Sequence, residues 1–246
     1  MPSFDVDTTE GPARLDWTGP DGGAPSFVLA LTHGAGGTVD TPDLFAARDA
    51  ALACGGGVAL VTQPYRVRGA RAPGHADRQD QAWTELITWL VSPAGPALPP
   101  SRTQRPRKAH QPHELRDTIA PFQAQLPLIQ GGRSNGARVA CRTAAAVGAR
   151  GVLALAFPLQ PPARRTRGSG EVTFPPDRAA ELRAATAGGA HVLVLNGDRD
   201  SFGIPAGDAS IEVVVLKGET HSLSKKPAVV AGAVAAWLPG VVALVP

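Results

Sequence analysis

The chain is poor in cysteine, aromatic residues and net charge, and each shortage argues against a class of protein. Its 246 residues include two cysteines, Cys54 and Cys141, so we expect buried free thiols and no disulfide framework. A formal net charge of +3 gives little electrostatic basis for binding nucleic acid. Apolar residues make up 43% and charged ones 18%, which is typical of a globular protein and not of a disordered one.

The two termini bear on whether the chain carries a targeting or membrane segment. The first eleven residues are polar and acidic and lack the pattern of a signal peptide, so we expect cytoplasmic residence. Residues 227–246 contain no charged side chain and are long enough to span a membrane. Because Pro239 and Gly240 interrupt them, we expect a buried helix over 227–238 followed by a short apolar tail. A membrane-associated lipase that uses this segment is a minor alternative.

Apolar runs alternate with helical patterns along the whole chain, which predicts one doubly wound α/β domain over residues 1–246 with a mostly parallel sheet and helices on both faces. The expected strands are 26–31, 57–62, 126–130, 151–156, 191–196 and 211–216, with 12–17 as an added edge strand. The expected helices are 42–53, capped by Thr41, and 76–91, 113–124, 135–148, 177–187 and 227–238.

Two segments do not fit this alternation. Residues 92–112 are rich in proline and basic residues without an apolar period, so they predict a long surface loop. Residues 158–176 follow an expected strand and contain three arginines. Because loops after the carboxyl ends of strands surround the ligand crevice in open α/β sheets, we expect this second segment to act as a rim or lid.

A nucleophile elbow is the strongest motif in the chain. Gly132, Ser134 and Gly136 form a G-x-S-x-G pattern between an expected strand and an expected helix, where a serine hydroxyl projects above the sheet. Two later strands lead into Asp200 and then into His221, so nucleophile, acid and base come in the chain order of an α/β-hydrolase. We prefer Asp200 to Asp198 as the acid, since it lies further past the strand end.

The glycine-rich loop after the first buried strand is the expected partner of this serine. It contains His33, Gly34, Ala35, Gly36 and Gly37, and its glycines allow the backbone to approach a substrate closely. We expect the amides of Ala35 and Asn135 to bind an oxyanion, with Gly36 as the next candidate after Ala35.

Three further residues are candidates for the substrate rim, and no residues are candidates for metal ligands. Arg66 follows an early strand and Arg133 adjoins Ser134, so an acidic or phosphate-bearing substrate is one interpretation and plain solvated arginines the other. Gln160 follows a later strand. No histidine or carboxylate cluster has the spacing of metal ligands, so we expect neither metal nor other cofactor.

The motifs quoted above, together with Gln63 to Arg66, Gly131 to Ala140, Ala156 to Leu159 and Gly197 to Gly203, resemble those of the α/β-hydrolase superfamily. Within it the chain resembles a small dienelactone-hydrolase-like branch, related to a testis-expressed hydrolase-like protein and to a regulatory subunit of the non-specific-lethal histone acetyltransferase complex. The resemblance implies triad roles for Ser134, Asp200 and His221. The chain departs from that branch at Gln160, where the family tends to carry histidine.

These observations predict a serine hydrolase that acts on a small carboxylic ester or thioester through an acyl-enzyme. The alternative is a hydrolase fold retained as a catalytically silent binding or scaffold protein, because fold does not guarantee activity. The pattern does not specify the acyl chain, the alcohol or thiol, or the oligomeric state.

Overall fold

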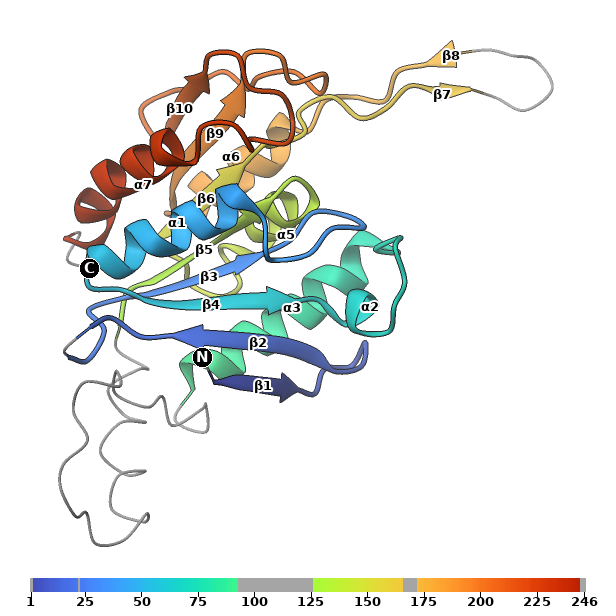
Figure 1. The fold of residues 1–246 in the computed structure, drawn as a ribbon. Coiled ribbons are helices and arrows are strands. Elements are labelled where there is room, and N and C mark those ends of the chain that lie inside the picture. Colours follow the sequence, from blue (N-terminus) through green and yellow to red (C-terminus); the bar gives the residue numbers. More distant parts are fainter. Residues whose placement is uncertain (1, 22, 93–125, 166–171, 244–246) are drawn as a thin grey trace, which may run out of the picture.

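The computed structural model describes residues 2–21, 23–92, 126–165 and 172–243, without the side chains of 164 and 165. The described chain forms an eight-stranded sheet with the order β1-β2-β4-β3-β5-β6-β9-β10 (Figure 1). The pairs β1–β2 and β2–β4 are antiparallel, and every other neighbouring pair is parallel. The strands of this sheet are β1 (Ser3–Val6), β2 (Ala13–Thr18), β3 (Val28–Thr32), β4 (Gly57–Thr62), β5 (Leu128–Arg133), β6 (Gly151–Leu155), β9 (His191–Gly197) and β10 (Ile211–Leu216).

Helices cover both faces of the sheet, which confirms the expected α/β class (Figure 1). One face packs against α1 (Pro42–Ala53) and α7 (Pro227–Val242), and the other against α3 (Ala76–Val91), α5 (Asn135–Thr143) and α6 (Ala179–Ala187). Successive side chains of β3 pack on alternate faces of the sheet. Leu29 and Leu31 lie in the core beside α1 and α7, and Val28 and Ala30 lie in the core on the other face. A strand buried on both faces is expected to be largely apolar, as β3 is from Val28 to Leu31.

The amino-terminal edge of the sheet differs from the expectation. The segment expected as an edge strand forms β2, one position inside the sheet, and β1 is the edge. Only Val6 of the four residues of β1 is buried. Its sequence is therefore not the continuous apolar run by which the buried strands were recognised. The short helix α2 (Pro64–Val67) was also missed.

The carboxyl-terminal helix was predicted too short. It continues through Pro239 and Gly240 to Val242, because Leu238 and Val241 are buried against the sheet on either side of the proline. Proline lacks the amide that would bond the carbonyl of Ala235, and the thiol of Cys54 lies 4.0 Å from that oxygen instead. None of the helices that the structure describes combines the length and apolarity required to cross a membrane.

Smaller corrections concern element ends. The strand expected at 126–130 is β5 and reaches Arg133, while the helix expected at 135–148 ends at Thr143 and is followed by turns. Thr41 occupies the N-cap position of α1, but its side chain makes no capping hydrogen bond. The expected helix over 113–124 and the basic loop over 92–112 lie outside the described residues, apart from Ser92.

Candidate active site

Ser134 lies between β5 and α5 in the strained conformation of a nucleophile elbow. Its backbone angles are φ 53° and ψ −109°, in a region that non-glycine residues rarely occupy. The glycines on either side are required by contacts with the main chain: a Cβ on Gly132 would stand 2.5 Å from Thr32 O, and one on Gly136 would stand 2.7 Å from His33 O. The small residues of the motif therefore let β3 and its loop pass directly against the serine.

Three predicted residues from three different strand ends meet at one point. His221 Nε2 lies 2.9 Å from Ser134 Oγ, and His221 Nδ1 lies 2.9 Å from Asp200 Oδ2. Because an ionised carboxylate only accepts hydrogen bonds, Nδ1 is assigned the proton and Nε2 is the acceptor for the serine hydroxyl. The Asp200 side chain is fully buried, while 23% of the His221 side chain is exposed. This arrangement can move a proton away from the serine oxygen.

The two aspartates after β9 have different partners. Asp200 accepts the amide N–H of Phe202 at 2.9 Å and the side-chain amide of Asn196 at 3.2 Å, in addition to His221. Asp198 accepts the amide of Gly218 at 2.7 Å and is exposed. The structure thus brings Asp200, and not Asp198, to the imidazole.

Two supporting residues of this acid and base were missed from the sequence. Asn196 is fully buried at the end of β9, and its amide also donates to the carbonyls of Phe157 and Gly203. Glu219 is fully buried two residues before His221 and accepts the amide of Lys225. The only signal for Asn196 was one polar residue at the end of an apolar strand.

The glycine-rich loop after β3 is held in place by its histidine. His33 is buried, its Nε2 accepts the amide of Gln63 at 3.0 Å, and its Nδ1 donates to Gly34 O at 2.9 Å. Burial lowers the pKa of His33 below its ordinary value, and the charge of Arg66 adds to that effect. The imidazole is therefore neutral and joins this loop to the residue after β4.

The loop that carries the first expected oxyanion donor, Ala35, forms a tight turn beside the serine. Gly37 N–H donates to Gly34 O, which closes a turn with Ala35 exposed and Gly36 at φ +67°. Within the described residues, neither the Ala35 nor the Asn135 amide N–H donates to a backbone acceptor. A Cβ on Gly34 would stand 3.3 Å from Ser134 Cβ, so the loop lies directly beside the serine.

Gln79 of α3 supports Asn135 and was also missed. Its Oε1 accepts the Asn135 side-chain amide at 2.6 Å, and its Nε2 donates to the carbonyls of Gly74 and His75. Gln79 therefore connects the first residue of α5 to the loop before α3.

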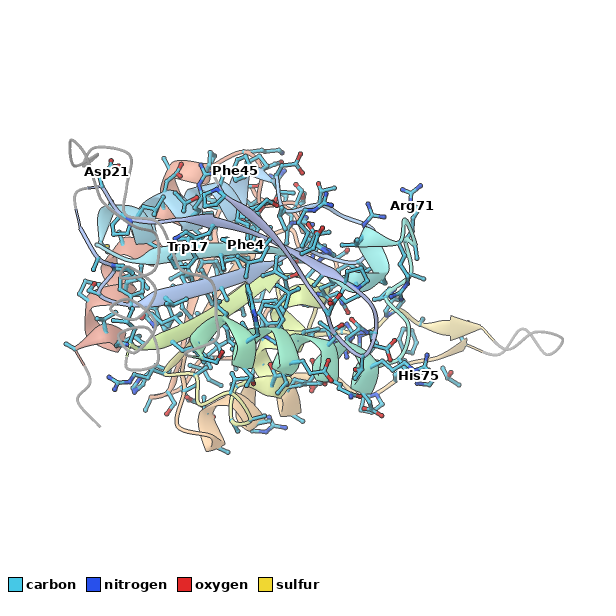
Figure 2. All side chains as sticks on the ribbon, turned by 90° about the horizontal axis from the view of Figure 1, so that it is seen from below. Phe4, Trp17, Asp21, Phe45, Arg71 and His75 are labelled. Atoms are coloured by element: carbon cyan, nitrogen blue, oxygen red, sulfur yellow. The ribbon has the colours of Figure 1, made fainter. Side chains whose placement is uncertain are left out.

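The predicted rim residues take different positions. Arg66 donates from Nε to Gly37 O at 2.9 Å and from Nη1 to Ala70 O at 3.1 Å, so it braces the glycine-rich loop. Arg133 pairs with buried Asp43 and donates to His221 O. Neither arginine is simply solvated. Exposed side chains of Arg71 and His75 project instead at the end of the molecule that carries the site (Figure 2).

The segment from 158 to 176 begins beside His221 and then extends away from the sheet. The amide of Gln160 donates to Phe202 O at 2.7 Å, and the Phe202 ring lies 4.6 Å from the His221 ring. Two short strands, β7 (Arg164–Arg165) and β8 (Val172–Thr173), pair antiparallel in an arm that projects away from the sheet (Figure 1). The root of the segment thus borders the site, whereas a lid role stays a prediction.

The described residues contain no group of three or more histidine, cysteine or carboxylate side chains arranged to hold a metal ion.

Comparisons with known proteins agree with this fold. The family model for the alpha/beta hydrolase domain matches residues 99–228, just over half of the chain. The chain belongs to the α/β-hydrolase family. The narrower resemblance to the testis-expressed protein and the non-specific-lethal complex subunit stays a prediction.

Solved structures of similar fold include a serine hydrolase, Est1E and a dienelactone hydrolase. An α/β serine hydrolase without lid from Xanthomonas campestris has a TM-score of 0.65 and 19% identity, covering 100% of this chain and 96% of its own. Est1E from Butyrivibrio proteoclasticus has a TM-score of 0.62 and 12% identity, covering 98% and 99%. A dienelactone hydrolase from Anabaena variabilis has a TM-score of 0.61 and 15% identity, covering 97% of each chain. No protein with a curated description matches the sequence.

Proposed function

We propose that this α/β-hydrolase is a serine hydrolase that cleaves a small carboxylic ester or thioester through an acyl-enzyme. The observation that carries the proposal is the continuous chain of hydrogen-bonding distances from Ser134 Oγ through His221 to Asp200, each 2.9 Å, at a strained elbow. A serine hydroxyl needs such a base to become a nucleophile at neutral pH.

In the proposed reaction, Ser134 Oγ attacks the carbonyl carbon while its proton passes to His221 Nε2. The carbonyl oxygen becomes an oxyanion that accepts hydrogen bonds from the amides of Ala35 and Asn135. Asp200 stabilises the imidazolium and keeps its orientation. His221 then returns the proton to the leaving alcohol or thiol, so the carbon–oxygen or carbon–sulfur bond breaks and an acyl-Ser134 ester remains.

Water completes the cycle on the same residues. His221 takes a proton from the water as its oxygen attacks the acyl carbon, and then returns it to Ser134 Oγ as the carboxylic acid leaves. Arg66 and Arg133 are bound to carbonyls and to Asp43, so the proposed substrate class does not require an anionic group.

Labelling with a fluorophosphonate probe tests the proposal. We expect one adduct at Ser134, none in Ser134→Ala, and hydrolysis of short acyl esters or thioesters that falls about a millionfold in that variant. Ser26→Ala, at the far end of the sheet, is the matched serine control and should label as the wild type does. Folded wild-type protein that forms no adduct would support the scaffold alternative instead.

A further inference from the structure

The guanidinium of Arg133 joins three parts of the candidate site. Its Nε lies 3.1 Å from Asp43 Oδ2 in the first turn of α1, and its Nη2 donates to the main-chain carbonyl of His221 at 2.8 Å. A Cβ on Gly34 would stand 3.5 Å from Nη1, so the glycine-rich loop passes close by. Only 18% of the Arg133 side chain is exposed. The residue next to the nucleophile therefore also contacts the loop of the base.

Asp43 holds the guanidinium of Arg133 through a buried ion pair. Its side chain is fully buried at the amino end of α1, where the helix dipole favours a negative charge. Burial raises the pKa of Asp43, while the Thr41 hydroxyl and the charge of Arg133 oppose the rise. A carboxylate in such a place requires a cation beside it, because a buried unpaired charge is strongly destabilising.

A second ion pair, between Arg14 and Asp5, shows that a short distance alone does not make a contact structurally important. Arg14 Nε lies 3.2 Å from Asp5 Oδ1, almost the same distance, but 53% and 63% of the two side chains are exposed. Water screens that pair, and its loss is expected to change little. The Arg133 pair differs in its burial and in its additional bond to His221.

We propose that Arg133, anchored by Asp43, is a positioning residue that holds the main chain of His221 at hydrogen-bonding distance from Ser134. The inference rests on the proposed function. Ser134 and His221 are joined directly through Oγ and Nε2, and a second time through the side chain of the residue beside the serine. Small displacements of a catalytic group lower the rate even when the substrate contacts are unchanged.

Four variants test the pair: Arg133→Gln, Arg133→Lys, Asp43→Asn and the double variant Asp43→Asn with Arg133→Gln. We expect Arg133→Gln to lower kcat and the rate of fluorophosphonate labelling about 100-fold, with KM within about threefold. Asp43→Asn should lower kcat about tenfold, and the double variant no further than Arg133→Gln, because the two residues act as one unit. Arg133→Lys should recover only part of the loss, since an ammonium cannot make both contacts of the guanidinium fork.

Arg14→Gln is the matched control and should keep wild-type rates. A second readout is hydrogen exchange of residues 217–225, which we expect to be about tenfold faster in Arg133→Gln than in the wild type and unchanged in Arg14→Gln. Wild-type rates and wild-type hydrogen exchange in folded Arg133→Gln and Arg133→Lys would overturn the positioning role of Arg133. If Arg133→Gln does not fold, the same measurements on Arg133→Lys decide. A wild type that does not label contradicts the proposed function, and hydrogen exchange then decides the positioning role alone.

Discussion

The two ends of the parallel strands are built from similar residues but held by different contacts. At the carboxyl ends, the space beside Gly132 and Gly136 is filled by main-chain oxygens of Thr32 and His33. At the amino ends, the space beside Gly151 is filled by the side chains of Val241 and Trp237. Side chains can change rotamer to accept a methyl group, whereas a carbonyl fixed in a sheet cannot.

Strain follows the same division. The described residues other than glycine that have positive φ are Ser134, Ala156 and Leu223, and each lies after the carboxyl end of a strand. Buried polar side chains also gather there, among them His33, Asn196, Asp200 and Glu219. The carboxyl ends of the strands therefore combine backbone strain with buried polar side chains. Such strain is typical of regions that hold functional loops in a fixed geometry.

The largest expected effect separates the two aspartates that follow β9. Asp200→Asn should lower kcat about ten-thousandfold, because an amide in place of the carboxylate no longer stabilises the charged imidazole or selects its tautomer. Asp198→Asn removes a carboxylate of the same loop that only accepts the Gly218 amide, and should stay within about threefold. Steady-state kinetics on an ester substrate measure both. Equal losses would contradict the assignment of the acid.

The next effect compares glycines at the two ends of the sheet. Gly132→Ala should lower the free energy of unfolding by about 3 kcal/mol, because its methyl group meets a fixed carbonyl, and should also displace Ser134. Gly151→Ala should cost about 1 kcal/mol with activity retained, since Val241 and Trp237 can shift at the end of α7. Denaturant unfolding measures the difference, and a larger loss in Gly151→Ala would reverse the comparison of the two ends.

The pH dependence of stability should reveal the buried imidazole of His33. Its lowered pKa means that only the unfolded chain takes up this proton as the pH falls below about 6.5, so stability present above that pH is lost on acidification. His33→Gln should remove about 1 kcal/mol of the stability change between pH 6.5 and 5.5. His191→Gln, an exposed histidine at the amino end of β9, is the control. A variant curve parallel to that of the wild type would show that His33 is not the group responsible.

The smallest functional effect is expected from the thiols. Cys141 is buried in α5, and burial raises the pKa of its thiol, so it should not react with iodoacetamide in the folded protein. Cys54 is partly exposed and should be alkylated, with activity kept within about twofold. Mass spectrometry locates the adduct, and unfolding in urea should expose Cys141 as well. Native labelling of Cys141 would show that α5 is less well packed than the rest of its core.

Local patterns allowed the elements and the three central residues to be predicted. Continuous apolar runs predicted β4, β6, β9 and β10 to within one residue at either end. Helical patterns predicted α1 and α3 with the observed bounds. The elbow at Ser134 could be recognised because its glycines are adjacent in sequence. Asp200 and His221 followed from their places after strands, since parallel strands bring their carboxyl ends together.

Residues that act through distant contacts could not be predicted in the same way. Gln79 contacts Asn135 across 56 positions and Arg133 contacts His221 across 88, and neither carries a local motif that indicates the partner. The continuation of α7 past Pro239 was missed for the same reason, because the burial that outweighs the proline is provided by the sheet.

The order of the longer strands and helices, the small residues of the elbow and the succession of serine, acid and histidine were determined by the sequence alone. Each of these depends on neighbouring residues and on the periodicity of strands and helices. The neutral state of His33 and the engagement of Arg66 and Arg133 were decided only by the tertiary structure, which also brings Asp200, already preferred from the sequence, to His221. Each of these depends on which groups are buried together, and burial is a property of the packed chain that distance along the sequence does not contain.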